Sequence, residues 1–129
     1  MKKLQTVLCV DDDAITLFLF KALVQKTNFA AKVITSKNGS EAIDYLINHL
    51  HKEQELPEYI FLDLNMPEMN GWEFLDAFQQ LQFANTTPKV IILTSSINIE
   101  DKKKAASYSI VEQYIEKPLR ANHLLEMVS

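Results

Sequence analysis

Short apolar runs rich in β-branched and aromatic residues alternate with segments of helical periodicity along the whole chain of 129 residues. The apolar runs predict strands over residues 6–10, 31–35, 59–64, 88–93 and 112–116. The periodic segments predict helices over residues 14–27, 39–52, 72–82, 99–109 and 119–129. A continuous apolar run such as residues 90–93 is typical of a parallel sheet covered by helices on both faces. The alternation therefore predicts one α/β domain, a doubly wound (βα)5 three-layer sandwich.

Charge and cysteine content exclude several classes of protein. Lys and Arg number 13 against 17 Asp and Glu, so a net charge of −4 provides no global field to attract nucleic acid. The single cysteine, Cys9, cannot form an internal disulfide and suits a reducing compartment. No apolar run reaches the roughly 18 residues of a membrane span. We therefore expect a cytoplasmic protein with no membrane segment and no direct nucleic acid binding.

Chemically active side chains lie at or just after the ends of four of the five predicted strands, at the sheet edge where such folds bind ligands. They are Asp11, Asp12 and Asp13 after the first strand, Asp63 at the end of the third, Thr94 and Ser95 after the fourth, and Lys117 after the fifth. Asp13 is expected to cap the first helix. The other carboxylates would repel one another, and a hard divalent cation would relieve that repulsion. A lysine and a hydroxyl suit phosphoryl oxygens, and a carboxylate can attack phosphorus, so the set predicts metal-assisted phosphoryl chemistry.

In these motifs the chain resembles the receiver domain of two-component response regulators, the chemotaxis-regulator-like family, over essentially its full length. The motifs occur in the family's order: the pair Asp11-Asp12, the segment DLNMPEMNG at 63–71, Thr94-Ser95 and Lys117-Pro118. Residues 94–98 and the extended loop before the third strand resemble stand-alone receivers such as phytochrome-associated response regulators.

The resemblance implies a flavodoxin-like parallel sheet of order 2-1-3-4-5 and a set of site residues. Asp63 would be the phosphoacceptor. The cofactor would be Mg²⁺ or Mn²⁺, bound by the carboxylates of Asp12 and Asp63, by the backbone oxygen of Asn65, and by Asp11 through a water. The phosphoryl oxygens would be held by Thr94, Ser95 and Lys117. The peptide bond before Pro118 is expected to be cis.

The resemblance also implies a signalling role. The donor would be a phosphohistidine on a histidine kinase or a histidine phosphotransfer protein. The chain would catalyse only its own phosphorylation and dephosphorylation, so it would not be an enzyme with an external substrate. Residues 1–129 would form a single receiver domain with no output domain within them, and a continuation past Ser129 is left open. Thr94 and Tyr114 would form a switch that changes the surface of the fourth helix, fifth strand and fifth helix, and with it partner binding or homodimerisation.

The first helix carries a candidate docking patch. Its inward side is expected to be Leu19, Phe20, Leu23 and Val24. Phe18 then lies on the solvent side, flanked by Ile15 and Ala22, beside the acidic site. An isolated exposed apolar residue is common, but a patch at this place favours protein docking.

Three other functions compete with a phosphorylation switch. A Mg²⁺-dependent phosphohydrolase with an aspartyl nucleophile would need a second acid two residues after Asp63, where this chain has Asn65. A flavin-binding protein would need a phosphate-binding loop after the first strand, where the acidic cluster would repel phosphate. A receiver-like scaffold that is never phosphorylated would not need every chemical position, and this chain has them all.

Overall fold

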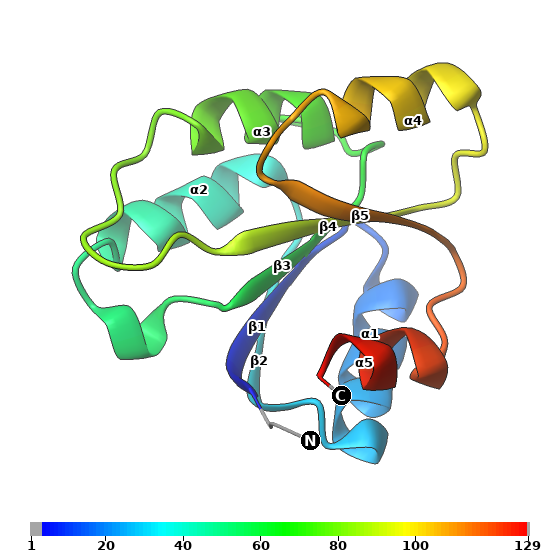
Figure 1. Ribbon diagram of the computed structural model, residues 1–129, viewed down its shortest axis with the longest axis horizontal. Helices are drawn as coiled ribbons and strands as arrows, with labels where there is room; N and C mark the ends of the chain where they lie inside the picture. Colours follow the sequence, from blue (N-terminus) through cyan, green and yellow to red (C-terminus); the bar gives the residue numbers. More distant parts are fainter. Residues whose placement is uncertain (1–3, 129) are drawn as a thin grey trace.

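The computed structural model describes residues 4–128 and consists of one five-stranded parallel sheet with helices on both faces. The strands, in spatial order, are β2 (Ala30–Ser36), β1 (Leu4–Val10), β3 (Tyr59–Leu62), β4 (Lys89–Thr94) and β5 (Val111–Glu116). The helices are α1 (Ala14–Thr27), α2 (Gly39–Asn48), α3 (Gly71–Phe78), α4 (Ile99–Ala106) and α5 (Ala121–Met127). Figure 1 shows α1 and α5 on one face of the sheet and α2, α3 and α4 on the other. The predicted fold class and strand order are confirmed.

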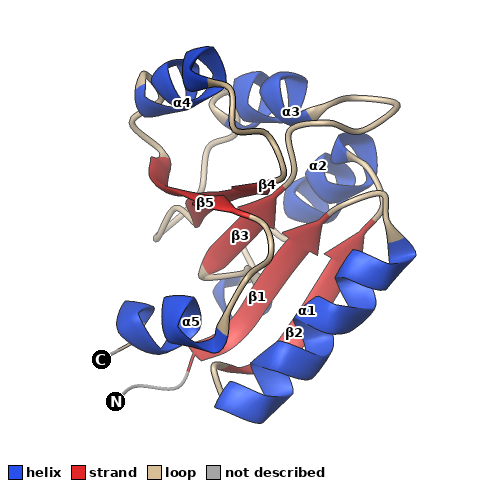
Figure 2. Ribbon diagram, turned by 90° about the vertical axis from the view of Figure 1, so that its right-hand side faces the viewer, coloured by secondary structure: helices blue, strands red, loops and turns tan. Residues whose placement is uncertain are grey.

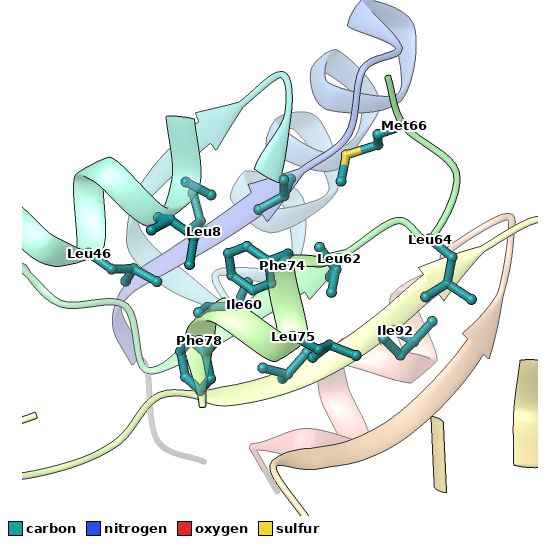
Figure 3. Packing of buried hydrophobic residues seen from close by; sticks show 14 of the residues in the cluster. Leu8, Leu46, Ile60, Leu62, Leu64, Met66, Phe74, Leu75, Phe78 and Ile92 are labelled. Atoms are coloured by element: carbon teal, nitrogen blue, oxygen red, sulfur yellow. The ribbon is translucent and has the colours of Figure 1, made fainter. Parts of the chain in front are cut away.

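Two apolar clusters fill the spaces between the sheet and its helices. Under α2 and α3, fully buried side chains of both helices meet those of β1, β3 and β4, as Figure 3 shows for Leu46, Phe74 and Ile92. On the opposite face, Phe20 and Val24 of α1 pack with Phe61 of β3. Because both faces of the central strands are covered, polar residues in them lie towards the ends, as Gln5 and Thr6 do in β1 and as Lys89 and Thr94 do in β4.

Short polar side chains cap the first turns of α1, α2 and α3. Asp13 accepts a hydrogen bond from Ile15 N at 3.0 Å, and Asn38 accepts one from Glu41 N at 2.8 Å. Asn70 and Glu73 form a reciprocal capping box at the start of α3. Because the strands are parallel, the loops that follow them lie at one edge of the sheet (Figure 2).

Several predicted boundaries are wrong by a few residues. The helix predicted over residues 39–52 ends at Asn48, and a 3₁₀ turn, Glu53–Glu55, follows where a loop is predicted. The helix predicted over residues 72–82 ends at Phe78, and the last helix begins at Ala121 rather than at residue 119. Helix ends fray into turns that apolar periodicity does not register.

The predicted orientation of α1 is wrong at one residue. Leu19 is 59% exposed, whereas Leu17 is buried together with Phe20 and Val24. Leu19 instead lines an open groove of about 220 Å³ beside Leu119. The groove is also lined by Lys117 and Pro118, which follow β5.

Within residues 4–128, no helix is both long enough and apolar enough to cross a bilayer.

Candidate functional site

Three carboxylates meet at the carboxyl end of β1 and β3, which are neighbours in the sheet. The hydrogen bonds between β1 and β3 continue one residue beyond β3, where Asp63 N donates to Val10 O at 3.0 Å. This bond keeps Asp63 beside Asp11, the residue that follows β1. Oxygen atoms of Asp11, Asp12 and Asp63 lie within 4.8 Å of one another. Asp11 and Asp63 are 1% and 7% exposed, and Asp12 is exposed. The cluster is therefore a half-open acidic pocket.

A lysine from the far end of the chain reaches this pocket. Lys117 N donates to Thr94 O at 2.9 Å, which continues the β4–β5 ladder past the end of β5. Lys117 Nζ lies 2.7 Å from Asp11 Oδ2 and 3.6 Å from Asp63 Oδ2. The Lys117–Pro118 peptide bond is cis. Two buried carboxylates thus share one ammonium group.

Burial and charge shift the ionisation of these groups in opposing ways. Burial raises the pKa of Asp63, and the charge of Lys117 offsets this only in part, while Asp11 raises it further. Burial acts to lower the pKa of Lys117, but the hydrogen bond to Asp11 and the charge of Asp63 outweigh burial and raise it. In number, three carboxylates of the pocket face one lysine.

The chemistry of the pocket fits a divalent cation with oxygen ligands. Asp11, Asp12 and Asp63 offer hard oxygen atoms, and the exposed position of Asp12 leaves room for water ligands. Asn65 follows closely, with its N–H 3.4 Å from Asp63 Oδ1. An Mg²⁺ or Mn²⁺ ion would supply the positive charge that the pocket lacks.

The predicted switch residues lie on the opposite side of the pocket from β1. Thr94 is fully buried at the end of β4, and its Oγ1 accepts a hydrogen bond from Ser96 N at 3.3 Å. Tyr114 of β5 is half-buried, and its hydroxyl donates to Ser96 O at 3.0 Å. Ser95 is exposed. Ser96 therefore bonds to both predicted switch residues, a link that the sequence analysis missed and that no motif indicates.

The predicted docking residues lie on the exposed side of α1. Ile15 and Phe18 are each 69% exposed, and Ala22 is exposed as well. Leu19, predicted to be inward, extends this apolar surface to the groove that Lys117 also lines. The apolar surface therefore adjoins the pocket through the lysine.

Comparison with known proteins gives matches along nearly the whole chain. The sequence model of the response regulator receiver domain family matches residues 7–129. A two-component response regulator from Cytophaga hutchinsonii is 35% identical, with a TM-score of 0.86 over 98% of each chain. The bacteriophytochrome response regulator RtBRR is 29% identical, with a TM-score of 0.76 over 97% of this chain and 76% of that one. The probable methanogenesis regulatory protein FilR2 of Methanothrix harundinacea is 29% identical over 122 residues, which are 95% of this chain and 77% of the relative.

Proposed function

This chain belongs to the response regulator receiver domain family, and from that premise we propose that Asp63 is the residue on which it accepts a phosphoryl group. The observation that carries the proposal is the position of Asp63: its carboxylate is buried beside Asp11, within reach of Lys117, at the carboxyl edge of the sheet. Thr94 and Lys117 come from the two neighbouring strands on the same side.

The reaction is an in-line transfer from a phosphohistidine of a histidine kinase or phosphotransfer protein. A carboxylate oxygen of Asp63 attacks phosphorus, the P–N bond breaks, and its electron pair returns to the imidazole of the donor. The product is an acyl phosphate. Lys117 and the hydroxyl of Thr94, with Ser95 at the rim, hold the phosphoryl oxygens and offset their charge.

The metal belongs to the same pocket. Asp12 and Asp63 would hold Mg²⁺ or Mn²⁺ through carboxylates, Asn65 through its backbone oxygen and Asp11 through a water. When bound, the ion neutralises negative charge that develops on the phosphoryl group. Asp63 is left with one oxygen for the metal and one for phosphorus.

The test of the acceptor is a substitution that keeps the shape and removes the nucleophile. Asp63→Asn should gain no phosphate from acetyl phosphate and Mg²⁺, as measured by intact mass. Asp13→Asn is the matched control, because Asp13 is exposed and asparagine caps a helix equally well. Phosphate on Asp63→Asn, or its loss from both variants, would contradict the assignment.

The same pocket does not favour a phosphohydrolase. Asn65 stands two residues after Asp63 and cannot exchange a proton with a leaving group. We propose that the chain modifies and restores only itself. Sustained turnover of a phosphomonoester would overturn this proposal. If acetyl phosphate failed to label the wild type, the result would instead favour a receiver-like scaffold that is never phosphorylated.

Docking of the donor protein is proposed on the apolar surface of α1, with Ile15, Phe18 and Ala22. Phe18→Ala should slow transfer from a cognate histidine protein and leave labelling by acetyl phosphate unchanged, because a small donor needs no docking surface. Ile47→Ala is the control, since Ile47 is 49% exposed on α2. Equal losses with both donors would mean that Phe18 supports the fold.

The response is proposed to pass from Thr94 through Tyr114 to the surface of α4, β5 and α5. When the Thr94 hydroxyl turns to the phosphoryl group, Ser96 N loses its acceptor, and the loop that holds Tyr114 is released. The output is a change in binding of a protein partner or in homodimerisation. Thr94→Ala should take up phosphate while hydrogen exchange in α4 and β5 no longer responds to beryllofluoride. An undiminished response would refute the coupling.

Residues 1–129 are proposed to act as one receiver domain, without an output domain among them, in the cytoplasm and without direct contact to nucleic acid.

A further inference from the structure

The sequence contains two glycines, and both lie against the same loop. At the average frequency of about 7%, a chain of this length would contain roughly nine. A Cβ atom at Gly71 would lie 2.7 Å from Asp63 O and 2.7 Å from Leu64 Cα. A Cβ atom at Gly39 would lie 2.6 Å from Met69 O. Gly39 therefore leaves room for the second half of the loop of residues 63–70, which begins with the proposed phosphoacceptor, and Gly71 leaves room for the first two residues of that loop.

This loop holds an unfavourable backbone conformation. Glu68 and Met69 have φ values of 46° and 60°, in the left-handed region that side chains other than glycine rarely adopt. Consecutive residues of this kind persist only where surrounding contacts determine them. Leu64 and Met66 anchor the first half of the loop in the core (Figure 3), so the second half needs a separate support.

The turn between β2 and α2 provides that support. Gly39 N donates to Met69 O at 3.2 Å, and Asn38 Nδ2 donates to Glu68 Oε2 at 3.4 Å. The contact joins residues 30 apart in the sequence. The two strained residues are thus each held by one residue of the same turn.

Helix α2 itself gives no reason for a glycine at position 39. Gly39 does not have a positive φ, and the helix is already capped by the side chain of Asn38. The remaining explanation for a glycine is the close approach of Met69, because a side chain at position 39 would collide with the backbone oxygen of Met69.

We propose that Gly39 is a positioning residue for the metal-assisted phosphorylation. By admitting Met69 O to within hydrogen-bonding distance, Gly39 fixes the strained half of the loop. This contact acts together with the core packing of Leu64 and Met66, and the two ends of the loop so held keep Asn65 beside Asp63. The inference rests on the proposed function, because it concerns the metal-binding loop of that site.

The first test compares two substitutions at the start of α2. Gly39→Ala must push Met69 away, and we expect its Kd for Mg²⁺, measured by calorimetry, to rise about tenfold, as for loss of other supporting contacts of metal ligands. Ala42→Gly is the control, because Ala42 is fully buried in the same helix and its backbone N–H donates to Asn38 O rather than to the loop. The urea midpoint of each variant reports its loss of stability. An unchanged Kd in Gly39→Ala, or the same rise in both variants, would overturn the proposal.

The second test needs no variant and so does not depend on its folding. In the wild type, Mg²⁺ should slow hydrogen exchange of the Gly39 amide at least threefold, because the coupling between turn and site is reciprocal. The His49 amide, which bonds to Leu46 O at the far end of α2, should not change. If the wild type binds Mg²⁺ while Gly39 exchange stays constant, this inference alone fails. If the wild type binds no Mg²⁺, the proposed function fails with it.

Discussion

Replacing Lys117 with methionine tests the charge balance of the pocket. The substitution leaves Asp11, 1% exposed, without the ammonium group that now lies 2.7 Å from its carboxylate. Breaking a fully buried ion pair costs about 3–5 kcal/mol. Because the Lys117 side chain is 22% exposed, water compensates in part, and we expect a loss of about 2 kcal/mol in the free energy of unfolding of the metal-free protein.

Magnesium should reverse much of this loss. Mg²⁺ at about ten times its Kd stabilises a folded protein by about 1.4 kcal/mol. Lys117→Met should gain more than the wild type, because no lysine competes with the ion for Asp11 and Asp63. Urea unfolding with and without Mg²⁺ measures both effects.

The control is Lys102→Met, which breaks an exposed pair with Glu116 at 2.6 Å. It should cost much less than Lys117→Met, because water screens an exposed ion pair, and it should not respond to Mg²⁺. Equal losses in the two variants, or a loss in Lys117→Met that Mg²⁺ leaves unchanged, would refute the view that lysine and metal neutralise the same carboxylates.

Asp63→Asn should unfold at higher urea than the metal-free wild type at neutral pH, because burial raises the pKa of Asp63 and makes its ionised form unfavourable in the folded state. The gain should vanish as the pH falls towards 3.8, where the wild-type carboxyl is protonated too, and a gain independent of pH would contradict this cause. Asp12→Ala should weaken Mg²⁺ binding at least about tenfold in calorimetry, with Asp44→Ala as an exposed control, and equal affinities would remove Asp12 from the ligand set. Lys104→Ala should change Trp72 fluorescence, because the ammonium group lies 4.5 Å from the ring centroid. A spectrum identical to that of Lys103→Ala would show that this contact does not persist in solution.

The fold and the gathering of the site residues were predictable because both follow from the order of strands. In a parallel sheet, the residues that follow β1, β3, β4 and β5 must lie at the same edge. Asp11, Asp63 and Lys117 therefore meet there, and errors in the predicted helix ends do not affect this. Their roles in phosphoryl transfer stay predictions.

Features that depend on packing between distant loops were not predictable. The exposure of Leu19 depends on how the segment after β5 lies, and apolar periodicity carries no information about that. The approach of Gly39 to Met69 joins two loops whose conformations are each irregular. The scarcity of glycine was a usable signal, since each of the two must meet a particular steric demand.

The ion pair between Asp11 and Lys117 spans 106 residues of sequence, which has a consequence for biosynthesis. A ribosome releases Asp11, Asp12 and Asp63 well before it makes Lys117. Until β5 joins the edge of the sheet, a partly made chain carries these carboxylates without the ammonium group that lies 2.7 Å from Asp11. The acidic pocket is therefore complete only after β5 has been made.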